Sequence, residues 1–156
     1  MRPDLAPFPA CRARVQWPAG QSRSKSERVQ AHRLKFSRLP GSFAICQLPA
    51  SADVPGWALP SAFFSVTRTA DELSVVCPQE IVPPDVRHVN AWACLKLEGP
   101  LPFSQTGILT AFVQPLSDGA IPIFAVSTFD TDYVLVKEAW IDEALEILKG
   151  AGHQAI

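Results

Sequence analysis

Two apolar runs separated by a short polar link stand out in the C-terminal third of the sequence. Residues 121–126 and 133–136 are rich in β-branched and aromatic side chains, and residues 127–132 between them are mostly polar. This pattern predicts an antiparallel hairpin. The link contains neither glycine nor an Asn-Gly pair, so we expect a loop wider than a two-residue turn. With its two carboxylates and three hydroxyls, such a loop could hold a small polar ligand.

The same pattern occurs sixty residues earlier in the chain. Residues 63–76 align with residues 123–136 without a gap, and this alignment places Glu72 on Asp132. Any two hairpins share apolar alternation, but here an acid and a hydroxyl of the link match as well. We therefore expect one supersecondary unit to occur twice.

The remaining apolar pattern predicts further strands and a helix that begins after residue 104. Ser104 or Thr106 is placed to cap this helix, and Pro115 in its last turn predicts a bend or an early end. Gly119 is suited to end it in a left-handed conformation. Apolar residues recur at helical spacing from residue 108 to residue 116. Strands are predicted at residues 42–48, 63–67, 73–77, 87–97 and, as a stub, 153–156.

A second, amphipathic helix is predicted over residues 138–149, where apolar positions recur at i, i+3, i+4 and i+7. Residues 87–156 then follow the order β-α-β-β-α-β. Residues 39–86 form a thinner version, whose first helix is reduced to a proline-rich stretch. Each unit would form an antiparallel sheet with helices on one face, so the predicted fold class is α+β.

The first 38 residues differ from the rest in composition. They carry nine Lys or Arg against two acids, whereas residues 39–156 carry five against thirteen. Residues 1–38 also lack apolar periodicity, so we expect a disordered basic N-terminal arm. We interpret it as an inert tail or a misplaced start; the alternatives are a targeting segment and an arm that contacts nucleic acid or anionic lipid. The acidic remainder argues against nucleic-acid binding by the folded part.

Several functional classes lack support in the sequence. There is no run of eighteen apolar residues, so no membrane span is predicted. The four cysteines show no Cys-x-x-Cys spacing, which is typical of reduced, buried thiols. His32, His88 and His153 are too scattered to indicate a metal site, and no nucleotide-binding, zinc-protease or hydrolase motif is present. We expect no metal, no cofactor and no catalytic residues.

Three segments near the second hairpin resemble a known family. A glycine-led helix start at residues 107–109, then Pro115-Leu116, then residues 121–132 are similar to the ACT domain. The chain looks most like the tandem ACT proteins related to the cytosolic arginine sensor CASTOR and to aspartate kinase regulatory domains. The resemblance covers about residues 40–154 and is most specific over residues 106–138.

This resemblance implies an architecture and a function. Two ferredoxin-like βαββαβ units are implied, a degenerate one over residues 39–86 and a complete one over residues 87–156. It also implies amino-acid binding without catalysis and side-by-side pairing of sheets, as in a homodimer. The N-terminal arm lies outside the resemblance.

The resemblance further implies where a ligand is contacted. The helix start and the residues one turn on would face the ligand, a strand start from a neighbouring unit would add backbone groups, and the hairpin link would close the site. The positions are Gly107, Ile108, Thr110, Pro122, Ile123, Thr128, Phe129, Asp130, Thr131 and Asp132. Arginine-sensing relatives carry an acid where this chain has Thr110, which argues against arginine itself.

The residues support such a site on physical grounds as well. Free N–H groups at a helix start near Gly107 suit a carboxylate, and a glycine lets the ligand approach the backbone closely. Asp132 or Asp130 suits an ammonium group. The alternative is that Gly107 is a packing glycine and both aspartates are solvated turn residues.

Three functions from different classes therefore compete. The leading hypothesis is a cytoplasmic, non-enzymatic amino-acid sensor that forms a homodimer and signals through an unknown protein, without nucleic acid or membrane. The second is an interaction module that pairs through sheet edges and binds no metabolite. The third is a small ferredoxin-like enzyme that uses Asp130 or Asp132 as a base.

Overall fold

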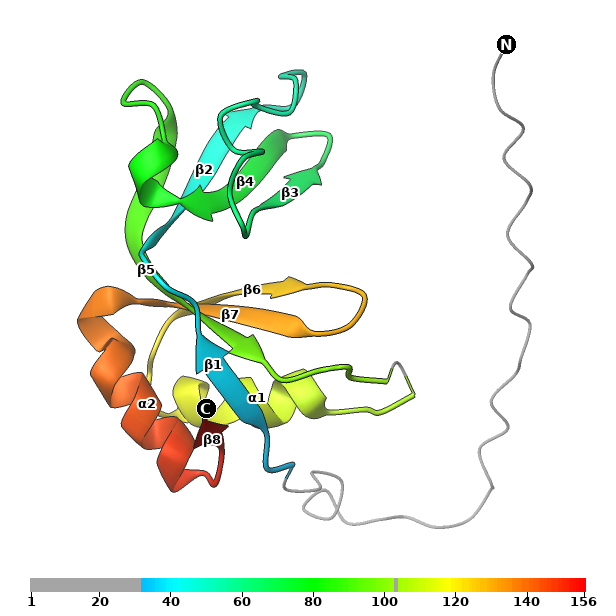
Figure 1. Ribbon diagram of the computed structural model, residues 1–156, viewed down its shortest axis with the longest axis vertical. Helices are drawn as coiled ribbons and strands as arrows, with labels where there is room; N and C mark the ends of the chain where they lie inside the picture. The colour runs from blue at the N-terminus through cyan, green and yellow to red at the C-terminus, as the bar shows by residue number, and fades with distance from the viewer. Residues whose placement is uncertain (1–31, 103) are drawn as a thin grey trace.

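The chain forms two lobes that share one long strand, as the computed structural model shows for residues 32–102 and 104–156 (Figure 1). This strand is β5, Arg87–Leu97, and it has the predicted bounds. Its first half pairs with β2 (Phe43–Pro49) in the upper lobe of the view, and its second half pairs with β7 (Asp132–Lys137) in the lower lobe. The fold is mixed α/β, with an eight-stranded sheet and two helices.

The two lobes differ in what covers their strands. The upper lobe contains β2, β3 (Ser65–Arg68), β4 (Glu72–Pro78) and the 3₁₀ turn η1 (Gln79–Ile81). The lower lobe contains β1 (Lys35–Arg38), α1 (Ile108–Asp118), β6 (Ile123–Ser127), β7, the 3₁₀ turn η2 (Glu138–Trp140), α2 (Ile141–Gly150) and β8 (Gln154–Ala155). From β5 onward the lower lobe follows the predicted order β-α-β-β-α-β. Helices on one face of the sheet are confirmed for this lobe alone, because the upper lobe has no α-helix.

Strand β1 corrects the predicted boundary of the N-terminal arm. Lys35–Arg38 was assigned to the arm, but it pairs with β5 in antiparallel fashion and with β8 in parallel fashion. Phe36 is buried and packs edge-on against Phe112 of α1, with ring centroids 5.2 Å apart. From residue 32, the chain therefore runs through the lower lobe, forms the upper lobe and returns along β5. Residues 1–31 of the arm predicted for residues 1–38 lie outside the described residues.

Three apolar clusters hold these layers together. One lies between the lower sheet and its two helices and contains Phe112 and Leu148. A second covers the outer face of the upper sheet. The third lies between the lobes, where Phe43 of β2 and Leu135 of β7 are buried and the rings of Phe63 and Tyr133 are 4.5 Å apart. The face of the lower sheet that carries no helix therefore packs against the facing side of the upper sheet.

Both predicted hairpins are confirmed, but the sixty-residue alignment on which the predicted repeat was based is wrong by one residue. In the first hairpin the Thr69 N–H donates to the Glu72 carbonyl, and in the second the Thr128 N–H donates to the Thr131 carbonyl. Equivalent positions are therefore 59 residues apart rather than sixty. A shift of one residue moves every side chain to the other face of a strand. Glu72 thus corresponds to Thr131, and the apparent match with Asp132 has no structural counterpart.

Helix α1 departs from its predicted ends. Its N-cap is Gly107, with no side-chain cap, rather than Ser104 or Thr106, and it continues through Pro115 to Asp118. Gly119 has an ordinary φ of −80°, so it does not end the helix in the left-handed region. A Cβ at this position would lie 2.6 Å from the terminal methyl group of Ile147 in α2, so that side chain would have to shift if Gly119 were replaced.

The proline inside α1 is accommodated by a buried histidine. A proline at position 115 cannot donate to the carbonyl of Ala111 four residues earlier. That carbonyl lies 3.1 Å from Nε2 of His153, whose Nδ1 accepts the Leu34 N–H at 3.2 Å. His153 therefore supplies the hydrogen bond that Pro115 removes and also joins α1 to the chain that enters β1.

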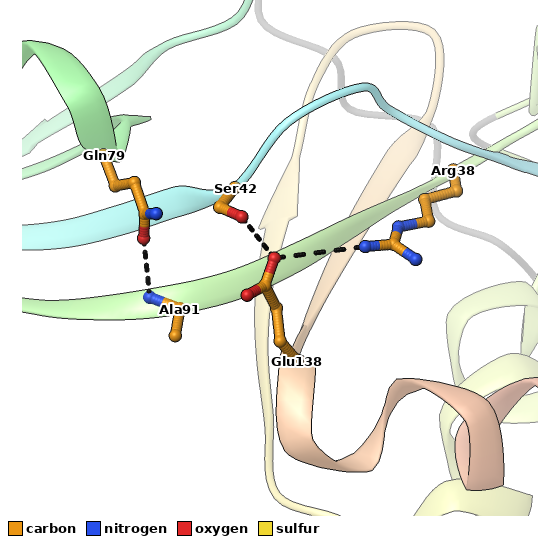
Figure 2. A network of polar contacts seen from close by, with 5 residues as sticks. All are labelled: Arg38, Ser42, Gln79, Ala91 and Glu138. Atoms are coloured by element: carbon orange, nitrogen blue, oxygen red, sulfur yellow. Dashed lines mark hydrogen bonds and ion pairs between the residues drawn. The ribbon is translucent and has the colours of Figure 1, made fainter.

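A polar network lies at the junction of the lobes (Figure 2). The carboxylate of Glu138 in η2 accepts a hydrogen bond from Ser42 and lies 4.0 Å from Arg38. Gln79 of η1 accepts the N–H of Ala91, at 3.0 Å, where β5 adopts a positive φ of 59°. Gln79 and Glu138 are 59 residues apart and occupy equivalent positions of the two units, but their contacts differ. Gln79 binds the backbone of β5, whereas Glu138 binds Ser42 and Arg38.

Candidate ligand-binding site

A cleft of about 310 Å³ lies at the end of the lower lobe. At this end α1 begins and the β6–β7 link turns (Figure 1). Three segments form the cleft: the loop after β5, the first turn of α1, and the link. Its lining residues are Leu101, Pro102, Gln105, Gly107, Ile108, Leu109, Thr110, Ser127, Thr128, Phe129, Thr131 and Asp132. The helix start and the hairpin link that the sequence singled out therefore meet in one place.

Seven of the ten predicted site residues line this cleft, and three do not. Pro122 and Ile123 lie at the other end of β6 from Ser127, and Ile123 packs against the core of the lower lobe. Asp130 is not among the lining residues, although its backbone carbonyl accepts the Leu101 N–H at 2.7 Å. That the seven residues bind a ligand stays a prediction.

The start of α1 presents unpaired backbone donors to the cleft. Gly107 has a left-handed φ of 79°, a conformation that costs a residue with a side chain about 1–2 kcal/mol. A Cβ there would meet no atom within 4 Å, so conformation and not packing calls for glycine. The first bond of the helix runs from Ala111 N–H to the Gly107 carbonyl. Within the described residues, the N–H groups of Ile108 and Leu109 find no acceptor, and they form the positive end of the helix.

The hairpin link is held by its own hydroxyl groups. The Thr131 hydroxyl is buried and donates to the Leu97 carbonyl at 2.7 Å, and the Thr128 hydroxyl donates to the Thr131 carbonyl at 2.7 Å. Two of the three hydroxyls expected to meet a ligand therefore fix the link instead. The third, on Ser127, donates to the carboxylate of half-buried Asp132 and so holds that acid at the cleft.

The sequence did not identify the loop after β5 as part of the site. A Cβ on Gly99 would lie 2.7 Å from the carbonyl oxygen of Asp130, so the loop and the link approach backbone to backbone. This approach brings Leu101 and Gln105 to the cleft. A Gly-Pro pair such as Gly99-Pro100 is typical of a loop, but only the folded chain shows which way that loop turns.

Groups of opposite charge line the cleft. Asp132 is the only ionisable side chain among its described lining residues, and the positive end of α1 lines the same cleft. An α-amino acid carries a carboxylate and an ammonium group at a short separation, so the cleft is complementary to that pair.

The described part of the chain offers little support for a metal site, a reactive thiol or a membrane-spanning helix. No three His, Cys, Asp or Glu side chains there are grouped so that they could hold a metal ion. Cys46, Cys77 and Cys94 are buried free thiols, and burial raises the pKa of Cys94 to about 12. No helix among these residues is long and apolar enough to cross a membrane.

Two protein-family models match consecutive parts of the chain. The family described as the ACT domain matches residues 87–150, and an N-terminal domain family matches residues 41–85. Both boundaries agree with the division of the chain at the start of β5.

Known relatives and solved structures agree with this assignment. The Bos taurus protein named cytosolic arginine sensor for mTORC1 subunit 1 is 29% identical over 124 residues, which are 74% of this chain and 36% of that protein. This chain thus spans about a third of that relative. A crystal structure of Agobacterium tumefaciens protein Atu0741 is 43% identical, with a TM-score of 0.77, over 80% of this chain and 93% of that one. Aspartate kinase from Clostridium acetobutylicum shares the fold at 14% identity, with a TM-score of 0.51, over 76% of this chain and 33% of the kinase.

Proposed function

Because the chain belongs to the ACT domain family, we propose that it binds a free amino acid in the cleft between Gly107 and Asp132 and acts as a regulatory, non-catalytic protein. The observation that carries the proposal is the convergence of an uncapped helix start and a single carboxylate on one small cleft. Either feature alone would be an ordinary surface detail.

In the proposed complex, each charged group of the ligand meets its complement. The ammonium group donates to the carboxylate of Asp132, which Ser127 orients. The carboxylate accepts from the free N–H groups that follow Gly107. The cleft volume of about 310 Å³ lies at the small end of the range for ligand sites, which suits a single amino acid.

The regulatory role is supported by the relatives. The Bos taurus relative is named a cytosolic arginine sensor. We extend from this relative a cytoplasmic location, an absence of catalysis and an unidentified protein partner that responds to the ligand. We also interpret the upper lobe as a degenerate ACT-like unit, which makes the chain a tandem of two.

A homodimer would complete the site as the family resemblance implies. Pro122 and Ile123 do not reach the cleft of their own chain, so their proposed backbone contacts would come from a second copy. A twofold dimer would then build two equal sites, and a ligand that binds only the dimer would stabilise it.

Titration calorimetry of the full chain against the twenty amino acids tests the proposal. We expect at least one to bind, and Asp132→Asn to weaken that binding by about tenfold to a hundredfold, since a charge-assisted hydrogen bond is lost. Asp130→Asn is the matched control, because it removes an equal charge two residues away and outside the cleft. Absence of heat with every amino acid, in protein shown to be folded, would refute the proposal.

A further inference from the structure

The lining of the proposed amino-acid cleft includes apolar side chains that the two charged groups of a ligand do not explain. Each of the three segments that form the cleft contributes at least one. Leu101 comes from the loop after β5, Leu109 from the first turn of α1, and Phe129 from the hairpin link. An α-amino acid also carries a side chain, so these residues indicate which class of side chain the cleft accepts.

Two of the three apolar side chains are held in place by the lower core. Leu101 and Leu109 are half-buried and pack against the cluster that contains Phe112. They therefore present a fixed apolar surface to the cleft. A ligand that covers this surface removes it from water, which favours binding roughly in proportion to the area covered.

The third apolar side chain is mainly exposed. Phe129 is 80% exposed, the largest value for a large apolar side chain among the described residues. An exposed aromatic ring in the lining of a cleft is typical of a surface that a ligand covers. An apolar group of a ligand would bury part of this ring.

Most hydroxyl groups of the lining already have acceptors within the protein. Those of Ser127, Thr128 and Thr131 donate to Asp132 or to backbone carbonyls. Apart from these residues, only Thr110 and Gln105 supply polar side chains among the described lining residues. A polar side chain of a ligand would therefore lose contacts with water and gain few partners, which disfavours its binding.

The charge of the lining also disfavours a charged side chain. Asp132 is the only ionisable side chain among the described lining residues, and in the proposed complex the ammonium group pairs with it. The second copy would contribute Pro122 and Ile123, and residues 119–127 around them contain no ionisable residue. A side chain such as that of lysine or glutamate would thus enter the cleft without an opposite charge, which is costly.

We propose that the cleft selects amino acids with an uncharged, apolar side chain, and that Leu101, Leu109 and Phe129 hold this side chain. The inference rests on the proposed function, because it names the class of amino acid that binds at the same site. Asp132 and the start of α1 provide affinity for any α-amino acid, and the three apolar residues provide the selectivity.

Titration calorimetry of the full chain with matched pairs of ligands tests the selectivity. Norleucine and lysine have similar aliphatic side chains, but lysine ends in an ammonium group. Leucine and asparagine have similar shapes, but asparagine carries an amide in place of two methyl groups. We expect norleucine and leucine to bind at least about tenfold more tightly than lysine and asparagine, respectively.

Variants of two lining residues identify what causes the selectivity. Phe129→Ala should weaken norleucine binding by about tenfold, because apolar contact is lost, whereas Phe129→Leu should retain most of the affinity. Because Phe129 is exposed, both variants should fold as the parent chain does. Gln105→Glu adds a carboxylate to the lining with little change of shape, so it should narrow the preference for norleucine over lysine by about threefold.

The possible outcomes separate this inference from the proposed function. Suppose that binding is weakened by Asp132→Asn, yet norleucine and lysine bind equally or Phe129→Ala has unchanged affinity for norleucine. The selectivity would then be overturned and the proposed function would stand. Tighter binding of lysine than of norleucine would also overturn the selectivity, because the lining would then have to accommodate a second charge. Absence of binding by every amino acid would overturn both.

Discussion

The two hairpins of this chain share a framework and differ in what their links face. Both have four-residue links closed by the same threonine hydrogen bond. At the position just before the link, the upper lobe has Arg68 and the lower lobe has Ser127. The guanidinium of Arg68 donates to the carbonyls of Ala50 and Ala52, whereas Ser127 is short and lines the cleft. In the upper lobe the Arg68 side chain therefore occupies the space next to the link, whereas in the lower lobe the equivalent space is part of the cleft.

The connection before each hairpin explains why only one of them forms a site. The upper lobe has residues 50–64 between its strands, and the lower lobe has residues 98–122. Only the longer connection contains a helix, and with it the free N–H groups of a helix start. A hairpin alone provides only one side of the cleft. The start of α1 provides the N–H groups that lie opposite in charge to Asp132.

The largest expected effect concerns the packing of that helix. Phe112 of α1 is fully buried in the lower core, so Phe112→Ala should lower the free energy of unfolding by about 3–5 kcal/mol. Phe64→Ala in the upper lobe, where the ring is 37% exposed, should cost well below that. Urea denaturation of both variants measures the difference, and equal losses would contradict the unequal role of the lobes.

The next effect concerns the pairing of His153 with the proline of α1. His153→Ala leaves the Ala111 carbonyl and the Leu34 N–H without partners, so we expect a loss of about 2–4 kcal/mol. Pro115→Ala should recover part of it, because an alanine N–H can reach the Ala111 carbonyl. A double-mutant cycle by urea unfolding should give a coupling energy of about 1 kcal/mol, and a coupling of zero would show that the two residues act independently.

Exchanging the residue before each link tests the contrast between the hairpins. Ser127→Arg should fill the cleft as Arg68 fills its counterpart, and it should weaken amino-acid binding by at least about tenfold. Arg68→Ser, measured by the same calorimetry, should leave binding unchanged and cost no more than about 1 kcal/mol of stability, since that side chain is exposed. Undiminished binding by Ser127→Arg would place the ligand elsewhere.

The smallest expected effect is a dependence of stability on pH. Burial lowers the pKa of His153, and its hydrogen bond to the Ala111 carbonyl offsets this only in part. The unfolded chain therefore takes up a proton at a higher pH than the folded chain does. The contribution of the neutral ring is complete above a pH of about 6.5 and is lost as the pH falls toward the folded pKa. Unfolding free energies measured from pH about 7.5 to about 5.5 should decline, and the decline should be smaller in His153→Gln.

Local patterns predicted most of the elements. Alternation and helical spacing placed β5, both hairpins and the two helices, because each of these patterns lies within a single stretch of chain. β1 was missed because only Phe36 of its four residues is fully buried, and the residues that pair with it are at least 57 positions away, as Leu95 is from Arg38. The register of the repeat was missed because a one-residue shift barely changes the sequence match, although it exchanges the faces of the strands.

The part of the site that local sequence patterns encode was predicted, and the rest was not. Gly107 and Asp132 each belong to a recognisable local pattern, and the fold brings them together. Leu101 and Gln105 reach the cleft only because the loop after β5 folds back on the hairpin link, and no local pattern encodes that direction. Pro122 and Ile123 were included on the expectation of a second copy, which a single chain cannot supply.

The position of β1 has a consequence for synthesis of the chain. β1 lies between β5 and β8, so this strand, the first in the described part of the chain, completes its pairing only when residues 154–155 have left the ribosome. Until then, one edge of Lys35–Arg38 stays open, and Leu34 lacks the imidazole that accepts its N–H. A chain that stops at Gly150 would carry every residue of the proposed site. It would lack His153, whose ring joins the Ala111 carbonyl of α1 to the Leu34 N–H.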